Sequence, residues 1–320
     1  MRSPGLADMT RTRVLGFLVL VLAVLVFPVA FGRYPVKLLQ EILIWGIYAM
    51  SLDLLMGYTG MVSFGHSAFF GVGGYVAALA LTSPGGATAG AVGALLLPGA
   101  AAALAALVIG FFSTRVRGVY FIMLTLAFSQ MLYAYAFQAS WLGAEDGING
   151  VPRPTLLGVP TGDGFTFHVY VVTITAGAAL FLWRVVRSPF GHVLVGIDEN
   201  EGRMEAVGYA VRRYKLLAFV LGGTLAGLAG SLYAQFSGSI TPDALFWKTS
   251  GEALLMVILG GTGTLGGAVL GAAAFILLQS IVSTYTERWM LILGAIFILF
   301  VLFAPGGIVG VLRGRFGLRA

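Results

Sequence analysis

The chain contains no cysteine and few charged residues, and both shortages limit what it can be. Without cysteine among its 320 residues, it cannot form a disulfide framework, a Cys-ligated metal site or a thiol nucleophile. Its three histidines, His66, His168 and His192, lie far apart and lack the spacing of metal ligands. Charged residues make up 10% of the chain, against about 25% in an average soluble domain. This composition excludes an ordinary water-soluble fold.

Long apolar runs are what the sequence has in abundance. Hydrophobic residues make up 58% of the chain and its mean hydropathy is +0.94, so lipid must surround most of its length. The apolar runs lie at about 14–31, 38–56, 62–82, 90–112, 119–139, 168–186, 215–236, 252–283 and 289–304. The first is longer than the apolar core of a cleaved signal peptide, about 7–15 residues, so we expect a retained membrane helix.

The basic residues predict how the chain is oriented. They account for a net charge of +6 and form short clusters between the apolar runs, a pattern typical of cytoplasmic loops and not of a nucleic-acid-binding surface. The clusters lie near the N-terminus and at 115–117, 184–215 and 313–319. We therefore expect both termini to be cytoplasmic. Segment 140–167 is mostly acidic in its charge and is expected to form a periplasmic loop.

The run 252–283 decides the number of crossings. It is too long for one helix, and glycines interrupt it at 260–267. Dividing it into two gives ten crossings and places the basic tail on the same side as the N-terminus. We therefore expect an all-α polytopic membrane protein, one transmembrane domain over 1–320 with about nine or ten segments, some of them broken or re-entrant. Leu54–Met56 recurs as Leu254–Met256, which an inverted repeat and chance similarity explain equally well.

Two glycine-rich stretches are candidates for the lining of a translocation path, because irregular backbone at membrane depth usually borders a cavity. Polar residues near the first stretch, Asp53 and His66, are each more simply explained as a helix cap and as a local hydrogen-bonding group. The candidate path residues are Asp53, Gly57, Thr59, Gly60, Ser63, Gly65, His66, Gly260, Gly261, Gly263 and Gly266. No lysine follows a glycine anywhere in the chain, so it has no Walker A site for ATP.

The longest hydrophilic segment, 188–214, carries charges of both signs. Within it, Asn200–Ala206 is expected to form a short helix closed by Gly208. A solvated loop and a helix that docks on a partner are equally good explanations. The paired carboxylates of Asp198 and Glu199 have no nucleophile or metal set beside them, so we do not expect an enzyme.

Several blocks of sequence, in this order, resemble the permease subunits of branched-chain amino acid ABC importers of the LivM type, over nearly the whole chain. The blocks are Leu52–Leu54, Gly57–Gly60, Ser63–Gly71, Gly118–Phe121, Leu124–Ala127, Asp146–Pro152, Ser188–Gly191, Asp198–Glu201, Glu205–Gly208, Tyr214–Phe219, Gly251–Glu252 and Gly260–Gly267.

The resemblance implies a subunit of a bacterial inner-membrane importer for branched-chain amino acids or related small polar solutes. It implies a second, LivH-type permease, two ATP-binding cassette ATPases and a periplasmic amino-acid-binding protein as partners, with ATP and magnesium bound by the ATPases and no cofactor in this chain. It also implies that 188–214 is a cytoplasmic coupling loop in which Asp198–Val207 forms the helix that meets an ATPase. The implied coupling residues are Asp198, Glu199, Asn200, Glu201, Arg203, Glu205, Ala206 and Gly208. The alternatives are the same architecture with urea, a short amide or a sugar as cargo, and an ion-coupled secondary transporter.

Overall fold

Helices make up almost all of the computed structural model, which describes residues 6–83, 90–156, 159–162, 164–303 and 306–316. The α-helices are α1 (Leu6–Ala30), α2 (Arg33–Thr59), α3 (Ser67–Thr82), α4 (Gly90–Ser113), α5 (Val119–Gln138), α6 (Gly164–Val186), α7 (Pro189–Ala206), α8 (Val211–Ser237), α9 (Trp247–Gly260), α10 (Leu265–Tyr285), α11 (Trp289–Phe303) and α12 (Gly307–Phe316). The short elements are η2 (Ser140–Leu142), η3 (Ala144–Asp146), η4 (Pro242–Leu245), β1 (Ile148–Asn149), β2 (Thr155–Leu156), β3 (Val159–Pro160) and β4 (Ser239–Ile240).

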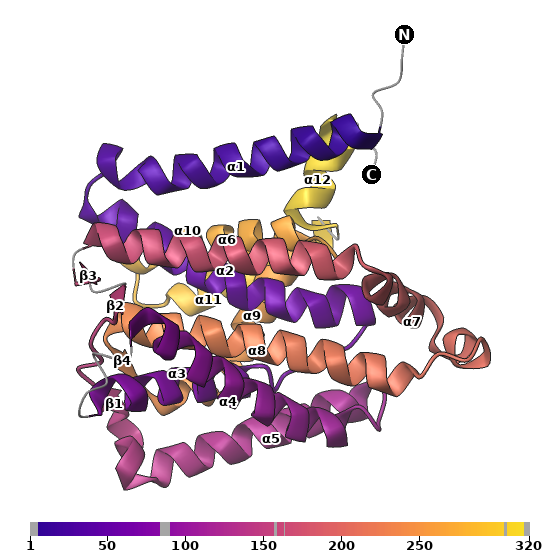
Figure 1. Cartoon of the computed structure of the whole chain (residues 1–320), viewed down its shortest axis with the longest axis horizontal. Helices are drawn as coiled ribbons and strands as arrows, with labels where there is room; N and C mark the ends of the chain where they lie inside the picture. Colours follow the sequence, from indigo (N-terminus) through magenta and orange to yellow (C-terminus); the bar gives the residue numbers. More distant parts are fainter. Residues whose placement is uncertain (1–5, 84–89, 157–158, 163, 304–305, 317–320) are drawn as a thin grey trace.

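The long helices lie side by side, so the molecule has two distinct ends (Figure 1). One carries the four short strands, in which β1 pairs with β4 and β2 pairs with β3, and we call it the strand end. The other carries α7, and we call it the α7 end. The first turns of α1 and helix α12 also lie at the α7 end.

Six helices of the described chain are long and apolar enough to cross a membrane: α2, the part of α4 from Gly93, α5, α6, α8 and α10. Large apolar side chains point outward on the outer helices, among them Leu104, Met131 and Leu299, as expected where lipid is the solvent. These features confirm an all-α polytopic membrane protein. Three further apolar helices are shorter, Leu18–Ala30, Ser67–Thr82 and Met290–Phe300, so nine or ten crossings stays a prediction.

Both glycine-rich stretches interrupt helices as expected. Gly60 ends α2 with φ +66°, a left-handed conformation that suits glycine, and the chain is not helical again until Ser67. The predicted division of 252–283 is confirmed because α9 ends at Gly260 and α10 starts at Leu265.

Helices α3 and α9 start in the middle of the bundle, and their N-termini meet there. The backbone N–H of Ser67, the first residue of α3, donates to Oγ of Ser250 near the start of α9, at 2.7 Å. With 16 and 14 residues, the two helices are about 24 and 21 Å long, less than the roughly 30 Å hydrocarbon thickness of a bilayer. From this meeting point α3 runs towards the strand end and α9 towards the α7 end.

This opposed pair, and not the sequence echo, fits an inverted repeat. Helix α4 packs on α3 and α8 as α10 packs on α9 and α2. The echo instead pairs α2 with α9, and these two run in the same direction: Trp45 and Glu252 border one cavity near the strand end, while Asp53 reaches Gly263 at the other end. The recurrence of Leu-Leu-Met therefore does not mark inverted copies.

Candidate functional site

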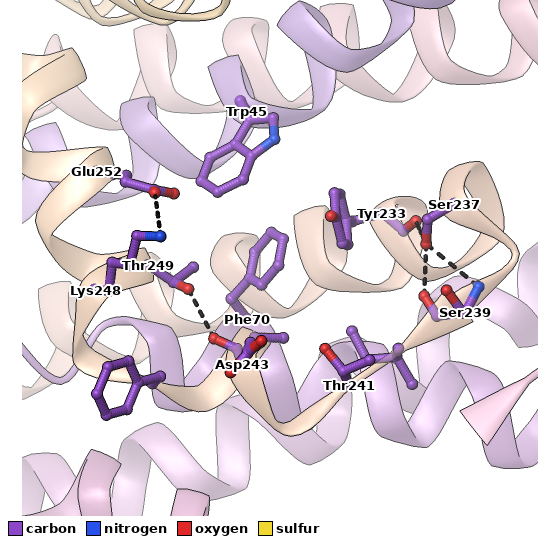
Figure 2. A pocket seen from close by; sticks show the side chains of 13 residues that line it. Trp45, Phe70, Tyr233, Ser237, Ser239, Thr241, Asp243, Lys248, Thr249 and Glu252 are labelled. Carbon is purple, nitrogen blue, oxygen red and sulfur yellow. Dashed lines mark hydrogen bonds and ion pairs between the residues drawn. The ribbon is translucent and has the colours of Figure 1, made fainter. Parts of the chain in front are cut away.

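A cavity of about 440 Å³ opens near the strand end, between α2, α3, α8 and the segment from β4 into α9 (Figure 2). We call it the strand-end cavity. Three aromatic rings, those of Trp45, Phe70 and Tyr233, form one wall, with ring centroids 5.5–6.1 Å apart. Trp45 and Phe70 are almost fully buried, so these rings form a fixed apolar surface.

Charged side chains line the same cavity. Lys248 and Glu252 project from successive turns of α9, with Nζ and Oε1 3.9 Å apart, and Asp243 lies on η4 (Figure 2). The hydroxyl of Thr249 donates to the backbone carbonyl of Asp243 at 2.9 Å, which ties the start of α9 to η4. The cavity therefore combines an aromatic wall with charges of both signs.

A second cavity, of about 450 Å³, opens at the α7 end, and we call it the α7-end cavity. It is bordered by Thr59, Gly60 and Val62 after α2, by the turn between α4 and α5, and by α7. Burial raises the pKa of Asp198 there, and the nearby negative charge of Glu199 raises it further.

Three buried serines lie between the two cavities, and we call them the serine cluster: Ser67, Ser129 and Ser250. The Ser67 and Ser129 hydroxyls are 2.9 Å apart, and both donate to the carbonyl of Leu245, at 3.1 and 2.7 Å. The cluster is therefore a fully packed polar layer at the point where α3 and α9 start.

His66 lies just before this layer and is fully buried. Its Nε2 is 2.8 Å from the hydroxyl of Ser51, which itself donates to the carbonyl of Tyr48 at 2.7 Å. Because that hydroxyl proton is committed to Tyr48, the Ser51 oxygen can only accept from the ring, so His66 carries a proton on Nε2 and donates it to Ser51. The expected local backbone bond of His66 is thus replaced by a bond to another helix.

Asp53 acts as a cap, as its simpler explanation predicted. Its Oδ1 accepts a hydrogen bond from the N–H of Gly263, at 2.8 Å, in the turn before α10. Gly57 lies against the same turn, where a Cβ would collide with the backbone of Gly263. Asp53, Gly57 and Gly263 therefore join α2 to the break between α9 and α10.

Of the candidate path residues, Thr59 and Gly60 border the α7-end cavity, and the other nine line neither of the two cavities described above. Ser63 is fully buried, and Gly65 is pressed against the backbone of Thr125 on α5. The glycines of the second stretch pack helix against helix: Gly260 meets Gly267, and Gly261 lies near Gly306, while Gly266 has open space around it. A lining role for all eleven residues stays a prediction.

Sequence reasoning missed the aromatic wall of the strand-end cavity. Trp45, Phe70 and Tyr233 come from three helices, and in each helix they look like ordinary apolar residues. One signal was available: Lys248 and Glu252 are four residues apart at the start of a long apolar run, where charge is costly unless it faces protein or water.

The predicted short helix of the hydrophilic segment is present. Asn200 has φ −161° and ψ 96°, which breaks α7 into two parts, and its side-chain oxygen accepts from the N–H of Arg203 at 2.9 Å. Gly208, with φ +99°, follows the second part. Asp198 and Glu199 therefore end the first part, and the helix implied for Asp198–Val207 begins at Glu201, three residues later than expected, and ends at Ala206.

Ion pairs hold the second part of α7 against the bundle. Glu201 pairs with Lys215 of α8 at 2.7 Å and with Arg117 at 3.3 Å, and Arg117 also pairs with Glu205 at 2.7 Å. Glu205 is exposed although it is paired, and Ala206 and Gly208 are exposed after it, as are the apolar side chains of Val207 and Tyr209. The tip of α7 thus combines anchoring charges with exposed apolar surface.

These features define a polytopic helical membrane protein in which two half-length helices meet between cavities that open at opposite ends. Residues 34–301 match the family described as branched-chain amino acid transport system / permease component, and the chain belongs to that family. It is therefore a transport permease component and not an enzyme.

Three relatives illustrate the range of the family. The chain is 27% identical to the high-affinity branched-chain amino acid permease LivM of Escherichia coli, over 94% of this chain and 75% of LivM. It is 26% identical to LivH of Salmonella typhimurium, over 83% of this chain and 91% of LivH. It is 33% identical to the autoinducer 2 import permease LsrC of Klebsiella pneumoniae, over 41% of this chain and 38% of LsrC. No solved structure matches the chain.

Proposed function

We propose that this chain is the translocation subunit of an ATP-driven importer and that it works by alternating access between the two cavities. The observation that carries the proposal is their arrangement: they open at opposite ends, and the lining of each comes within one or two helical turns of the buried serine cluster. Small movements of α3 and α9 at their meeting point would open one side and close the other, because packed interfaces switch between discrete arrangements.

The α7 end is proposed to face the cytoplasm. The clusters at 115–117 and 184–215 lie at this end, as do helix α12 and the first turns of α1. Positive residues concentrate on the cytoplasmic side of membrane proteins. The strand end, with segment 140–167, would then meet a periplasmic amino-acid-binding protein.

The second part of α7 is proposed to dock on one of two ATPase subunits, with a second, LivH-type permease completing the membrane part. The exposed tip supports this proposal because Val207 and Tyr209 are both exposed within one turn of chain, and neighbouring exposed apolar side chains, unlike single ones, mark contact surfaces. Asp198, Glu199, Asn200, Glu201, Arg203, Glu205, Ala206 and Gly208 remain the proposed coupling residues.

Branched-chain amino acids are the proposed cargo, by similarity to LivM and LivH. The partial match to the autoinducer 2 import permease LsrC keeps a cargo other than an amino acid, such as the sugar considered above, as the second candidate within the same architecture. ATP-dependent uptake of leucine by vesicles that contain the complex purified through this chain tests both points. Uptake without ATP would instead indicate an ion-coupled transporter, and uptake of a sugar but not leucine would change the cargo.

A charge exchange tests the coupling surface. We expect Glu205→Lys to reduce transport strongly while insertion is unchanged, because it removes the Arg117 pair and alters the surface offered to the ATPase. The double variant Arg117→Glu with Glu205→Lys restores this pair with its signs exchanged but loses the Arg117–Glu201 pair, so Arg117→Glu alone is its control. Recovery of transport in the double variant would mean that Glu205 acts only through its pair with Arg117 inside this chain. Continued loss of ATPase co-purification supports docking of Glu205 on the ATPase.

A further inference from the structure

We propose that the strand-end cavity is itself a binding site for a zwitterionic amino acid, held by its two charged groups between Glu252 and Lys248 and by its side chain against Trp45, Phe70 and Tyr233. The inference rests on the proposed function and assigns part of cargo recognition to this chain.

The spacing of the charge pair leaves both members available to a ligand. Lys248 Nζ and Glu252 Oε1 are 3.9 Å apart, close enough for an ion pair but beyond the roughly 2.7–3.2 Å of a hydrogen bond, so each can still form a hydrogen bond to a ligand. Their side chains are 48% and 22% exposed and both face the cavity (Figure 2). An α-amino acid carries its carboxylate and ammonium on one carbon, so the two can meet Lys248 and Glu252 at the same time.

Asp243 adds a second carboxylate to the cavity wall. With one lysine and two carboxylates, the lining favours a ligand that brings an ammonium group, and the lysine still offers a partner for a carboxylate. A neutral sugar or amide would leave these charged groups without a partner of opposite charge, which makes such ligands poor matches for the cavity.

The aromatic wall suits the remaining part of the ligand. The three rings contact one another and lie next to Ile240 and Ala244, both buried. A branched aliphatic side chain placed there would be removed from water without needing a polar partner. The volume of about 440 Å³ lies within the range of about 300–1,000 Å³ usual for small-molecule sites.

The test measures equilibrium binding to the transporter purified through this chain, in nanodiscs and without the binding protein. The probes are L-leucine, 3-methylbutylamine, which lacks the carboxylate, and 4-methylpentanoate, which lacks the ammonium group. We expect leucine to bind and each analogue to bind about tenfold more weakly, since each loses one charged contact.

Two substitutions then separate the contacts. Glu252→Gln should weaken leucine about tenfold and leave 4-methylpentanoate unchanged, whereas Lys248→Gln should weaken leucine and leave 3-methylbutylamine unchanged. Glu287→Gln and Lys37→Gln, at exposed positions outside the cavity, should change nothing. A merely misfolded variant would weaken all probes together, so the pattern identifies the contact.

Leucine binding that is absent, or unaffected by Glu252→Gln, overturns the site. If ATP-driven leucine uptake is nonetheless normal in the wild type and in Glu252→Gln, the proposed function stands and only the binding site fails. If the wild type takes up no leucine under any condition, the proposed function itself fails.

Discussion

At the scale of single residues, a few polar groups hold the membrane-embedded breaks together. Asp53 is fully buried, and one of its carboxylate oxygens accepts a hydrogen bond from the turn before α10. The backbone N–H of Ser67 donates to the hydroxyl oxygen of Ser250. Groups of this kind are costly in lipid, so each has its position fixed by a specific partner. A substitution that removes one of these hydrogen-bonding groups should therefore lower stability more than one that keeps it.

Asp53→Ala should destabilise the protein by about 1–3 kcal/mol, because it removes the acceptor of the Gly263 N–H and leaves that donor without a partner in the partly buried turn before α10. Asp53→Asn keeps an acceptor oxygen of the same shape and should cost clearly less. Thermal unfolding of the three forms in the same nanodiscs measures the difference. Equal losses for both variants would contradict the capping role.

Asp198 predicts a dependence of stability on pH. Its pKa is raised in the folded protein by burial and by Glu199, so the ionised form is disfavoured there. The folded protein therefore favours the protonated form of Asp198. This contribution to the free energy of unfolding is fully present below the pKa that Asp198 has in the unfolded chain, and it is lost as the pH rises through the folded pKa. Unfolding midpoints from pH 4 to 8 should fall less steeply with pH for Asp198→Asn than for the wild type. Identical slopes in the two proteins would contradict the shift.

At the scale of helices, close contact between α3 and α8 fixes the half-length helix in place. Gly73 lies against the backbone of Gly227, and Gly230 lies against the backbone of Phe70, so the two helices touch without intervening side chains. Such small-residue contacts are the main source of attraction between helices in lipid. The start of α3, and with it the serine cluster, depends on this contact.

Gly73→Ala should destabilise the protein by about 1–3 kcal/mol, because the new methyl group would collide with backbone that cannot move aside. Gly177→Ala on α6 is the matched control: nothing lies near its Cβ position, and alanine favours helix by up to about 1 kcal/mol. Unfolding midpoints of both variants check the contrast. A neutral Gly73→Ala would show that α3 and α8 are less tightly packed than described.

The sequence predicted the helices better than it predicted the cavities. Apolar runs located the helices. The glycines at 260–267, together with the requirement that both basic termini lie on one side of the membrane, correctly predicted that 252–283 is divided into two helices. The same glycines were expected to line a path, yet most of them pack helices together, because glycine serves close packing and open cavities equally well. Trp45, Phe70 and Tyr233 meet only through tertiary packing, which no local pattern encodes.

At the scale of the whole molecule, function depends on the relation between the two cavities. The strand-end cavity reaches Phe70 and Thr249, each within one turn of the serine cluster, and the α7-end cavity reaches Phe121 and Ile122 on α5, two turns from Ser129. A partner that pulls on α7 acts next to Gly60, because the Asp198 carboxylate lies against that residue. Movement of α7 can therefore reach the break between α2 and α3 directly.

Alternating access is tested most directly by thiol accessibility, which the absence of native cysteine makes simple. Thr241→Cys would report on the strand-end cavity and Val62→Cys on the α7-end cavity, with exposed Ser140→Cys as a reference. Labelling with a membrane-impermeant reagent would be compared in resting complexes and in complexes trapped with ATP and vanadate. We predict that trapping changes the two cavity positions in opposite directions while position 140 stays constant. Changes in the same direction, or none at either position, would contradict the account.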